Sequence, residues 1–435
     1  MTSIDEENND SDSKYDEIYE SAEDEDKLQK QPQKTAAGLM RDAHGEIIRE
    51  KGLSFLVALL DFLKGLIGSG FLALPWAFCR VGPWSGLILL FFIAFLNYYS
   101  MSLLVQCAQY HYVRLNIPYL SCGNVARETC KVSFRWVQGH GRLAKNIVNM
   151  VTLLHQFGVC SLYYKFIAFN LKEIIGHMFE DLHSGPWSDL WPWFLLTFLP
   201  MVVLNSILSL YVLSILCIIG DVLTLSSLAV ILYVLPLENK IKKPERMLRC
   251  FGVLSWGIFL STPIYACVGF LGHLAYGDKV HPSITQNLPK HRISITLVKL
   301  ALCLSIFASF LLEMYVIIRV TWPRIDRWML KLSRSCKFCC KMFFRALMVL
   351  ICFLVAYYVP NTSRVGPLIG ATTGTLLAFV FPAMIDLFTF VPLLLKQNHF
   401  REAYLRCCQN ILLVLIALFI MAGGLMNIPA LAEAM

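Results

Sequence analysis

The sequence predicts an all-α membrane protein that crosses the bilayer many times, and composition is the first observation behind this prediction. Hydrophobic residues make up 57% of the 435 residues and charged residues only 16%, whereas soluble globular proteins have about 45–50% and about 25%. The second observation is that the apolar residues gather in ten long segments. A soluble globule cannot bury so much apolar surface, so a soluble enzyme is excluded as the default interpretation.

Charge divides the chain into two parts. Residues 1–40 hold 12 acidic and four basic residues, and this polar composition predicts a disordered acidic tail in the cytosol. Residues 41–435 form the predicted transmembrane transporter domain, whose basic clusters between apolar segments are not the pattern of a nucleic-acid binder. Tyr15 and the three residues after it fit a sorting signal. The plasma membrane and the lysosomal or endosomal membrane are therefore both predicted locations.

Each apolar segment has about the 20 residues that a helix needs to cross the bilayer. None shows the alternating stretches of about 10 residues that mark β-barrel strands. The stretch from Leu190 to Leu237 contains one charged residue, Asp221, and as a single helix it would be about 72 Å long, so it is divided into two crossings. The ten segments are 53–80, 84–107, 146–171, 191–206, 209–235, 251–276, 293–318, 342–360, 365–386 and 409–428.

The basic residues of the loops test this count of crossings. If all ten segments cross from a cytosolic N-terminus, the inside loops hold 10 Lys and Arg and the outside loops 17, against the positive-inside rule. If the number of crossings before residue 238 is even, the inside loops hold 22 and the outside loops five. Either one of the first five segments does not cross, or a helix is missing just before Leu235, and charge leaves both open.

The first segment is interrupted by small residues. Gly65, Gly68, Ser69 and Gly70 are followed by Pro75, and glycine destabilises a helix interior by about 1 kcal/mol relative to alanine. Irregular backbone at membrane depth is tolerated where it lines a cavity, and broken helices offer backbone N–H groups to substrate carboxylates in many transporters. Close packing of helices explains the same residues equally well.

Five groups of motifs occur in a specific order along the chain. They are Lys64-Gly65 with Ile67-Gly68-Ser69-Gly70 and Leu74-Pro75, Gln156-Phe157-Gly158, Leu235-Pro236-Leu237-Glu238-Asn239, Ser283-Ile284-Thr285-Gln286-Asn287-Leu288-Pro289, and Gly370-Ala371 with Asp386. This order resembles the amino acid/auxin permease superfamily, and within it the animal proton-coupled amino acid transporters. The resemblance runs from about residue 53 to residue 428.

The resemblance implies an inverted-repeat fold of eleven helices, of which ten are apparent here. It also implies a secondary transporter of small neutral amino acids of the glycine, alanine and proline class, driven by a proton gradient without any other cofactor. The substrate would lie between broken first and sixth helices in the lipid bilayer. The expected substrate-binding residues are Ile67, Gly68, Ser69, Gly70 and Phe71.

The chain departs from the family where the sixth helix is expected. Val230-Ile231-Leu232-Tyr233 resembles the end of the fifth helix, yet it runs directly into the motif that begins at Leu235. Comparison with the family implies that most of the sixth helix is absent. The alternative function is therefore a truncated variant without transport, which acts through retention or through association with a full-length partner.

Two carboxylates in apolar segments are the proton-coupling candidates. Asp61 stands where relatives have a proton-sensing histidine, and Glu313 where they have glutamine; carboxylates inside the membrane are functional candidates by default. Asp61 lies one helical turn from Lys64, and Glu313 shares a segment with Lys299. In each case an internal ion pair is the structural alternative. We interpret His155 as a hydrogen-bonded packing residue.

The sequence does not predict an enzyme or a metal site. It contains no phosphate-binding loop, no catalytic triad spacing and no second cysteine pair of the kind that zinc requires. Cysteines beside basic residues next to a membrane favour palmitoylation over zinc binding, with plain reduced cysteines as the alternative. The palmitoylation candidates are Cys336, Cys339, Cys340, Cys407 and Cys408.

Overall fold

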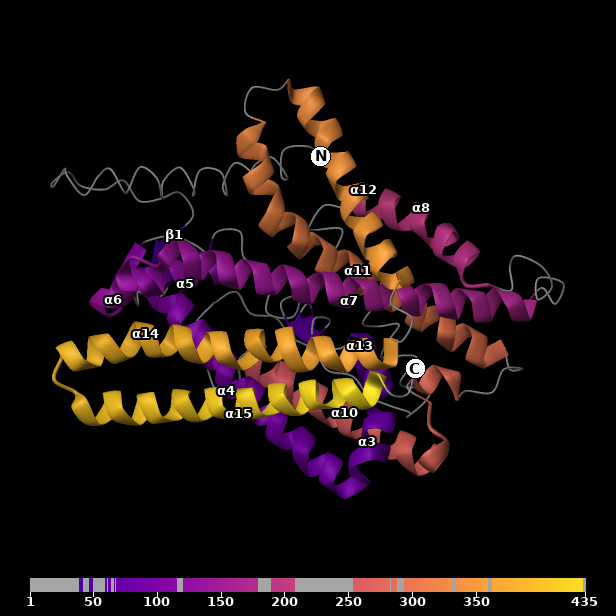
Figure 1. Ribbon diagram of the computed structural model, residues 1–435, viewed down its shortest axis with the longest axis horizontal. Helices are drawn as coiled ribbons and strands as arrows, with labels where there is room; N and C mark the ends of the chain where they lie inside the picture. Colours follow the sequence, from indigo (N-terminus) through magenta and orange to yellow (C-terminus); the bar gives the residue numbers. More distant parts are fainter. Residues whose placement is uncertain are drawn as a thin grey trace.

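The computed structural model is a bundle of long helices, several of which pack against one long helix, α7 (Gly141–Met178), that runs through the bundle (Figure 1). A short antiparallel hairpin of β1 (Leu39–Arg41) and β2 (Ile47–Arg49) precedes the first helix and was not predicted from the sequence. Residues 1–38, which include nearly all of the predicted tail, lie outside the described residues. The structure describes residues 39–41, 47–49, 59–60, 62–63, 66, 68–115, 120–178, 189–207, 253–281, 283–287, 293–329, 333–358 and 362–432.

The helices follow the predicted apolar segments. Every predicted segment overlaps a helix except 209–235, which lies outside the described residues. Short 3-10 turns η2 (Ser69–Ala73), η6 (Gly277–Lys279) and η7 (Ile284–Gln286) and π-helical turns η8 (Gly370–Gly374) and η9 (Leu376–Val380) connect them. The α-helices are α3 (Leu74–Val81), α4 (Pro83–Leu115), α5 (Cys122–Val132), α6 (Arg135–Gln138), α7 (Gly141–Met178), α8 (Trp191–Ile207), α10 (Val253–Tyr276), α11 (Ile293–Trp328), α12 (Arg334–Tyr358), α13 (Thr362–Ile369), α14 (Phe381–Lys396) and α15 (Phe400–Ala432).

Six described helical stretches are long and apolar enough to cross a membrane. They lie in α4, in α10, in α11, in α12, in the stretch that ends with α14, and in α15, and shorter apolar helices cover Gly70–Val81 and Trp191–Ser206. The predicted segment 146–171 lies within α7, whose apolar run is interrupted by Asn149, His155 and Gln156. The predicted class, an all-α polytopic membrane protein, is confirmed.

The core is a set of aromatic contacts between α7 and the helices beside it. Tyr164 of α7 stacks on Phe194 of α8 with ring centroids 5.5 Å apart, and meets Phe353 of α12 edge-on at 5.9 Å. The Tyr164 hydroxyl also donates to the Phe194 carbonyl at 2.7 Å. Because lipid tails are as apolar as leucine, such packing and hydrogen bonding, and not exclusion of water, hold these helices together.

A buried ion pair holds α14 against α15 and α4. Asp386 is fully buried, and Arg406 binds both of its carboxylate oxygens, at 2.7 and 2.8 Å. Asn410 donates to the same carboxylate at 2.8 Å, and the Cys107 thiol of α4 approaches it at 3.7 Å. The bidentate contact joins α15 to α14, and the Cys107 thiol brings α4 to the same carboxylate. A bidentate contact is the strongest geometry for an arginine–carboxylate pair.

Polar contacts at the helix ends show which ends share a side of the bundle. The start of α7 meets the end of α11, where Arg324 donates to Asn146 at 3.0 Å. At the opposite end, Lys299 pairs with Glu173 at 2.9 Å. After the turn from α11, Arg345 of α12 donates to the Asn205 carbonyl of α8 at 2.6 Å. Helix α8 therefore ends on the side where α7 begins.

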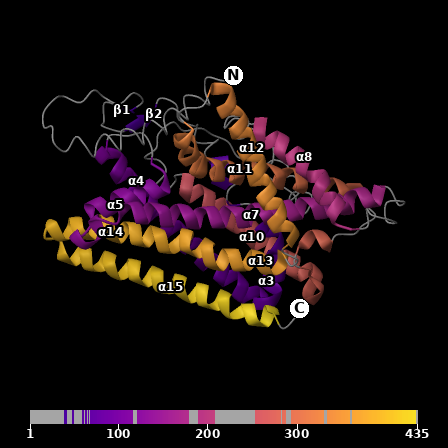
Figure 2. The ribbon, with the colours of Figure 1, turned by 45° about the horizontal axis from the view of Figure 1, so that its top comes forward.

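Helix α10 begins toward that same side. It runs antiparallel to α4, because Phe270 meets Trp84 at 5.4 Å between ring centroids and Ser255 donates to Tyr98 at 3.3 Å. The far end of α4 reaches α5 through His111 and Thr129, 3.1 Å apart, and α5 packs on the first turns of α7, as Figures 1 and 2 show. The end of α8 and the start of α10 therefore point toward the same side of the described bundle.

This sidedness predicts a topology. Phe62 packs against Gly257 near the start of α10, so the N-terminal tail should lie on the same side as the basic 319–345 loop. Epitopes placed in the two segments should both be protected in intact cells and both become accessible when the plasma membrane is permeabilised. An epitope in the turn at Lys279 serves as the control for the opposite side. Tail and loop on opposite sides would contradict the even count of crossings.

Candidate functional site

The first membrane helix is interrupted at Gly68, which is one of the two interpretations that the glycines leave open. Leu66 is helical, Gly68 is extended with φ −92° and ψ −165°, and η2 starts at the next residue. Regular α-helix resumes at Leu74, with Pro75 in its first turn, where a proline needs no N–H partner. The Gly68 N–H donates to the Leu66 carbonyl at 3.0 Å. The backbone therefore leaves the helical hydrogen-bond pattern inside the bundle.

Two tyrosines hold the interruption in place. The Tyr265 hydroxyl of α10 donates to the Leu66 carbonyl and supplies a partner that the broken helix no longer provides. The Tyr163 side chain of α7 lies directly against Gly68: a Cβ atom there would overlap the tyrosine hydroxyl and stand 3.3 Å from Cζ. Gly68 is therefore required by the approach of α7. The sequence pattern contained no signal for Tyr265.

Gly70 has a different environment from Gly68. A Cβ atom at Gly70 would meet no atom within 4 Å, and the residue is exposed, whereas its neighbour Phe71 is 5% exposed. Close packing, the alternative explanation of the glycines, thus accounts for Gly68 but not for Gly70. Ile67 lies outside the described residues, and only the backbone of Ser69 is described.

The loop that follows the C-terminal end of α10 covers the interruption. Ile284 of η7 is buried in the same core cluster as Phe71, and η7 packs on η2. Asn287 holds this loop closed: its amide donates to the Lys279 carbonyl at 2.9 Å, and its carbonyl oxygen accepts from the His281 N–H at 2.8 Å. The motif from Ser283 onward thus forms a cap over η2.

One face of α7 connects the interruption to Glu313. Gln156, Cys160 and Tyr163 follow one another at helical spacing, so they share that face. Tyr163 contacts Gly68, and the Gln156 side chain lies beside the Glu313 carboxyl group of α11. Seven residues of helix separate Gln156 from Tyr163, about 10 Å along the axis. The candidate site is therefore the Gly68 interruption together with this polar face.

The structure corrects one interpretation of Glu313. An ion pair with Lys299 was the structural alternative for this carboxylate, but Lys299 binds Glu173 of α7 at 2.9 Å. Fourteen residues of α11 separate Lys299 from Glu313, about 20 Å along the axis, so the two side chains cannot meet. The other carboxylate candidate, Asp61, and its neighbour Lys64 lie outside the described residues.

His155 is a packing residue, as interpreted from the sequence. Its Nδ1 lies 3.1 Å from the Thr373 hydroxyl, and Gly374 packs on the same imidazole ring. Both partners lie in η8, one of two consecutive π-helical turns. No sequence pattern indicated the π-helical turns, which are the segment that α7 contacts here.

The cysteine candidates lie at the starts of two helices. Cys336, Cys339 and Cys408 are exposed, and Cys340 and Cys407 are half-buried. They open α12 and α15, so palmitoylation of these thiols remains a prediction. Among the residues that the structure describes, His, Cys, Asp and Glu side chains do not gather in any group that could hold a metal ion.

A multi-span helical bundle with an interrupted first helix is the architecture of a secondary transporter. The chain belongs to the amino acid/auxin permease family, described as "Transmembrane amino acid transporter protein", which matches residues 51–236 and 229–428. It is 26% identical to "Probable amino acid transporter skat-1" of Caenorhabditis elegans, over 86% of this chain and 90% of that protein. It is also 26% identical to "Proton-coupled amino acid transporter-like protein pathetic" of Drosophila melanogaster, over 76% of each chain.

The family match is divided at an informative place. Its two pieces meet at residues 229–236, where the sequence predicts that the sixth helix is missing. The alignment with the Caenorhabditis elegans protein is 426 positions long but covers only 86% of this chain, so some positions of that relative have no counterpart here. The junction itself lies outside the described residues.

Substitution of Gly68 and of Gly70 by leucine distinguishes substrate binding from helix packing as the role of these glycines. Gly68→Leu should abolish uptake, because its side chain collides with Tyr163, and should spare insertion, because apolar bulk is tolerated in the bilayer. Gly70→Leu enters open space, so it should fold normally and still lose uptake if substrate occupies that space. Uptake of labelled amino acid is measured in this chain and with a sixth helix inserted before Val234.

Gly423→Leu is the matched control for both variants. A Cβ atom at Gly423 would also meet no atom within 4 Å, and this glycine lies on α15, away from the interruption. The control should insert and transport as the parent does. Normal uptake by Gly70→Leu would contradict substrate binding at Gly70.

Proposed function

We propose that this chain is a secondary transporter of small neutral amino acids that is driven by protons. The observation that carries the proposal is the interruption at Gly68, fixed by Tyr163 and Tyr265 and joined through one face of α7 to Glu313. Membership of the amino acid transporter family supports amino acids in general as the substrates. One relative bears the name of a proton-coupled amino acid transporter-like protein, which supports the coupling ion.

The substrate carboxylate binds at the start of η2. The first N–H groups of a helix have no partner within it, and the helix dipole favours an anion at this end. The backbone of Ser69, Gly70 and Phe71 supplies these groups, and they are preceded by Ile67 and by Gly68, whose N–H donates to the Leu66 carbonyl. The open space at Gly70 beside the buried Phe71 ring suits a small substrate, of the glycine, alanine and proline class.

Glu313 carries the coupled proton. A carboxylate inside the membrane is costly unless it is paired or protonated, and Gln156 lies beside Glu313. A glutamine side chain can donate to the charged carboxylate or accept from the protonated acid, so Gln156 serves both states. Asp61 is the second candidate for this role, with an ion pair to Lys64 as its structural alternative.

A form without transport is the second candidate function, and the loop charges favour it. They favour an even number of crossings before residue 238, whereas the sequence offers five apolar segments there. A substrate amino group would need carbonyls of the sixth helix, most of which this chain lacks. Such a form would act through retention or by association with a full-length partner.

The protein is an integral multi-pass membrane protein. The assignment of its loops to the cytosol or to the opposite side of the membrane follows from charge. The loops with most Lys and Arg are placed in the cytosol by the positive-inside rule, and the N-terminal tail with them. The plasma membrane and the lysosomal or endosomal membrane both remain proposed locations.

Uptake of labelled glycine, alanine and proline at acid and neutral pH tests the proposal. The chain is compared with a version that carries a sixth helix before Val234. Acid-stimulated uptake by the chain itself supports the proposal, and uptake by the restored version alone supports the second candidate. Uptake by neither would overturn transport of these amino acids.

The same assay locates the proton. Glu313→Gln mimics the protonated acid, so uptake should lose its dependence on pH while substrate exchange persists. Glu402→Gln on α15 removes the same charge from an exposed side chain and is the control. Retained acid stimulation in Glu313→Gln with its loss in Asp61→Asn would move the role to Asp61; poor expression of Asp61→Asn would indicate the pair with Lys64.

A further inference from the structure

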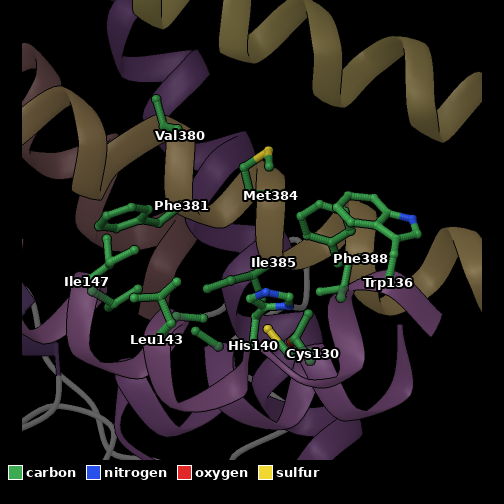
Figure 3. Close-up of a pocket in the computed structure, with 15 residues that line it drawn as sticks. Cys130, Trp136, His140, Leu143, Ile147, Val380, Phe381, Met384, Ile385 and Phe388 are labelled. Atoms are coloured by element: carbon green, nitrogen blue, oxygen red, sulfur yellow. The ribbon is translucent and has the colours of Figure 1, made fainter. Parts of the chain in front are cut away.

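A groove lies between α14 and the corner formed by α5, α6 and α7, away from the Gly68 interruption. Its volume is about 490 Å³, and its lining is almost entirely apolar, with Trp136, Leu143 and Ile147 on one wall and Met384 and Phe388 on the other. Figure 3 shows Trp136 and Phe388 together at one end, and Val380, Phe381 and Ile147 at the other. The proposed transport function uses none of these side chains.

The groove is open at the surface of the bundle, beside a stretch that could cross a membrane. Trp136 is 70% exposed and Leu143 56% exposed, and α14 belongs to a stretch long and apolar enough to cross a membrane. An apolar groove at this position offers no partner for water, so hydrocarbon is its natural content.

The groove also has a direction. Trp136 stands at one end, stacked on Phe134 at 6.5 Å and edge-on to Phe388 at 5.9 Å between ring centroids. Tryptophan marks the membrane–water interface. The α7 wall continues from His140 to Ile147, about 10 Å of helix. The groove thus runs from the interface into the hydrocarbon, as an acyl chain does.

Basic residues surround the interfacial end. Residues 120–145 contain five Lys and Arg and one acid, Glu128, which is buried and pairs with Lys131 at 3.1 Å. Arg135, next to Trp136, is exposed, and the turn between α14 and α15 brings the exposed Lys396 to the same end of the bundle (Figure 2). A negative head group is complementary to this end.

We propose that the groove binds an anionic phospholipid of the leaflet that α6 faces. One acyl chain lies between α7 and α14, and the phosphate and its negative head group lie beside His140, Arg135 and Lys131. Ordinary zwitterionic phospholipid fits the groove equally well but lacks the charge that these residues attract. Phosphatidylserine and phosphatidylcholine with identical chains are therefore the matched probes.

Native mass spectrometry of the full chain tests this proposal. Protein in mixed micelles with equal amounts of the two lipids should retain phosphatidylserine in preference. Arg135→Gln, a surface change, should reduce that preference about fivefold, the effect of one basic residue near the head group. Equal retention of both lipids by the parent chain would overturn the proposal.

Two tryptophan variants test whether the lipid binds in this groove. Ala144→Trp fills the groove, because Ala144 is one of its lining residues, and should abolish retention. Leu412→Trp on the exposed face of α15 is the matched control and should retain lipid. Thermal unfolding confirms that each variant is folded; if Ala144→Trp is not, Leu143→Gln replaces it and should weaken retention of both lipids. Undiminished retention in a folded groove variant would contradict the site.

Discussion

Lipid offers no hydrogen-bond partner to the backbone, and the first helix of this protein is broken where that constraint applies. The break at Gly68 leaves the Leu66 carbonyl without its helical partner, and each such group costs free energy unless something replaces it. Tyr265 of α10 supplies the replacement, while Tyr163 of α7 fills the space that a side chain at Gly68 would need. Two neighbouring helices thus fix the irregular backbone on which the proposed binding site depends.

Other polar contacts position α7 against α11. Lys299 and Glu173 set the register of α11 along one end of α7, and Arg324 with Asn146 sets it at the other. Because the partners of each contact come from different helices, an exchange of one helix for another would leave a charge unpaired in the membrane, which is strongly destabilising. The same contacts define which ends of α7 and α11 share a side of the bundle.

The sequence was sufficient for features that depend on composition or on local backbone chemistry. Apolar length predicted the helices, and the glycines predicted the break, since both are properties of one segment. Partners across the bundle were not predictable: Lys299 was paired with Glu313 of its own helix, although its partner is Glu173 of α7. Tyr265 carries no pattern of its own, and the π-helical turns beside His155 follow from packing that a single segment does not encode.

The central claim is that Tyr265 holds the broken backbone through its hydroxyl, and Tyr265→Phe removes only that oxygen. Hydrogen–deuterium exchange over residues 66–73, compared with Tyr358→Phe at an exposed site of α12, tests it directly. We expect faster exchange in this segment for Tyr265→Phe alone, with a free energy of unfolding lowered by about 0.5–1.5 kcal/mol, the usual net contribution of one hydrogen bond. Exchange and stability equal to those of the parent chain would contradict it.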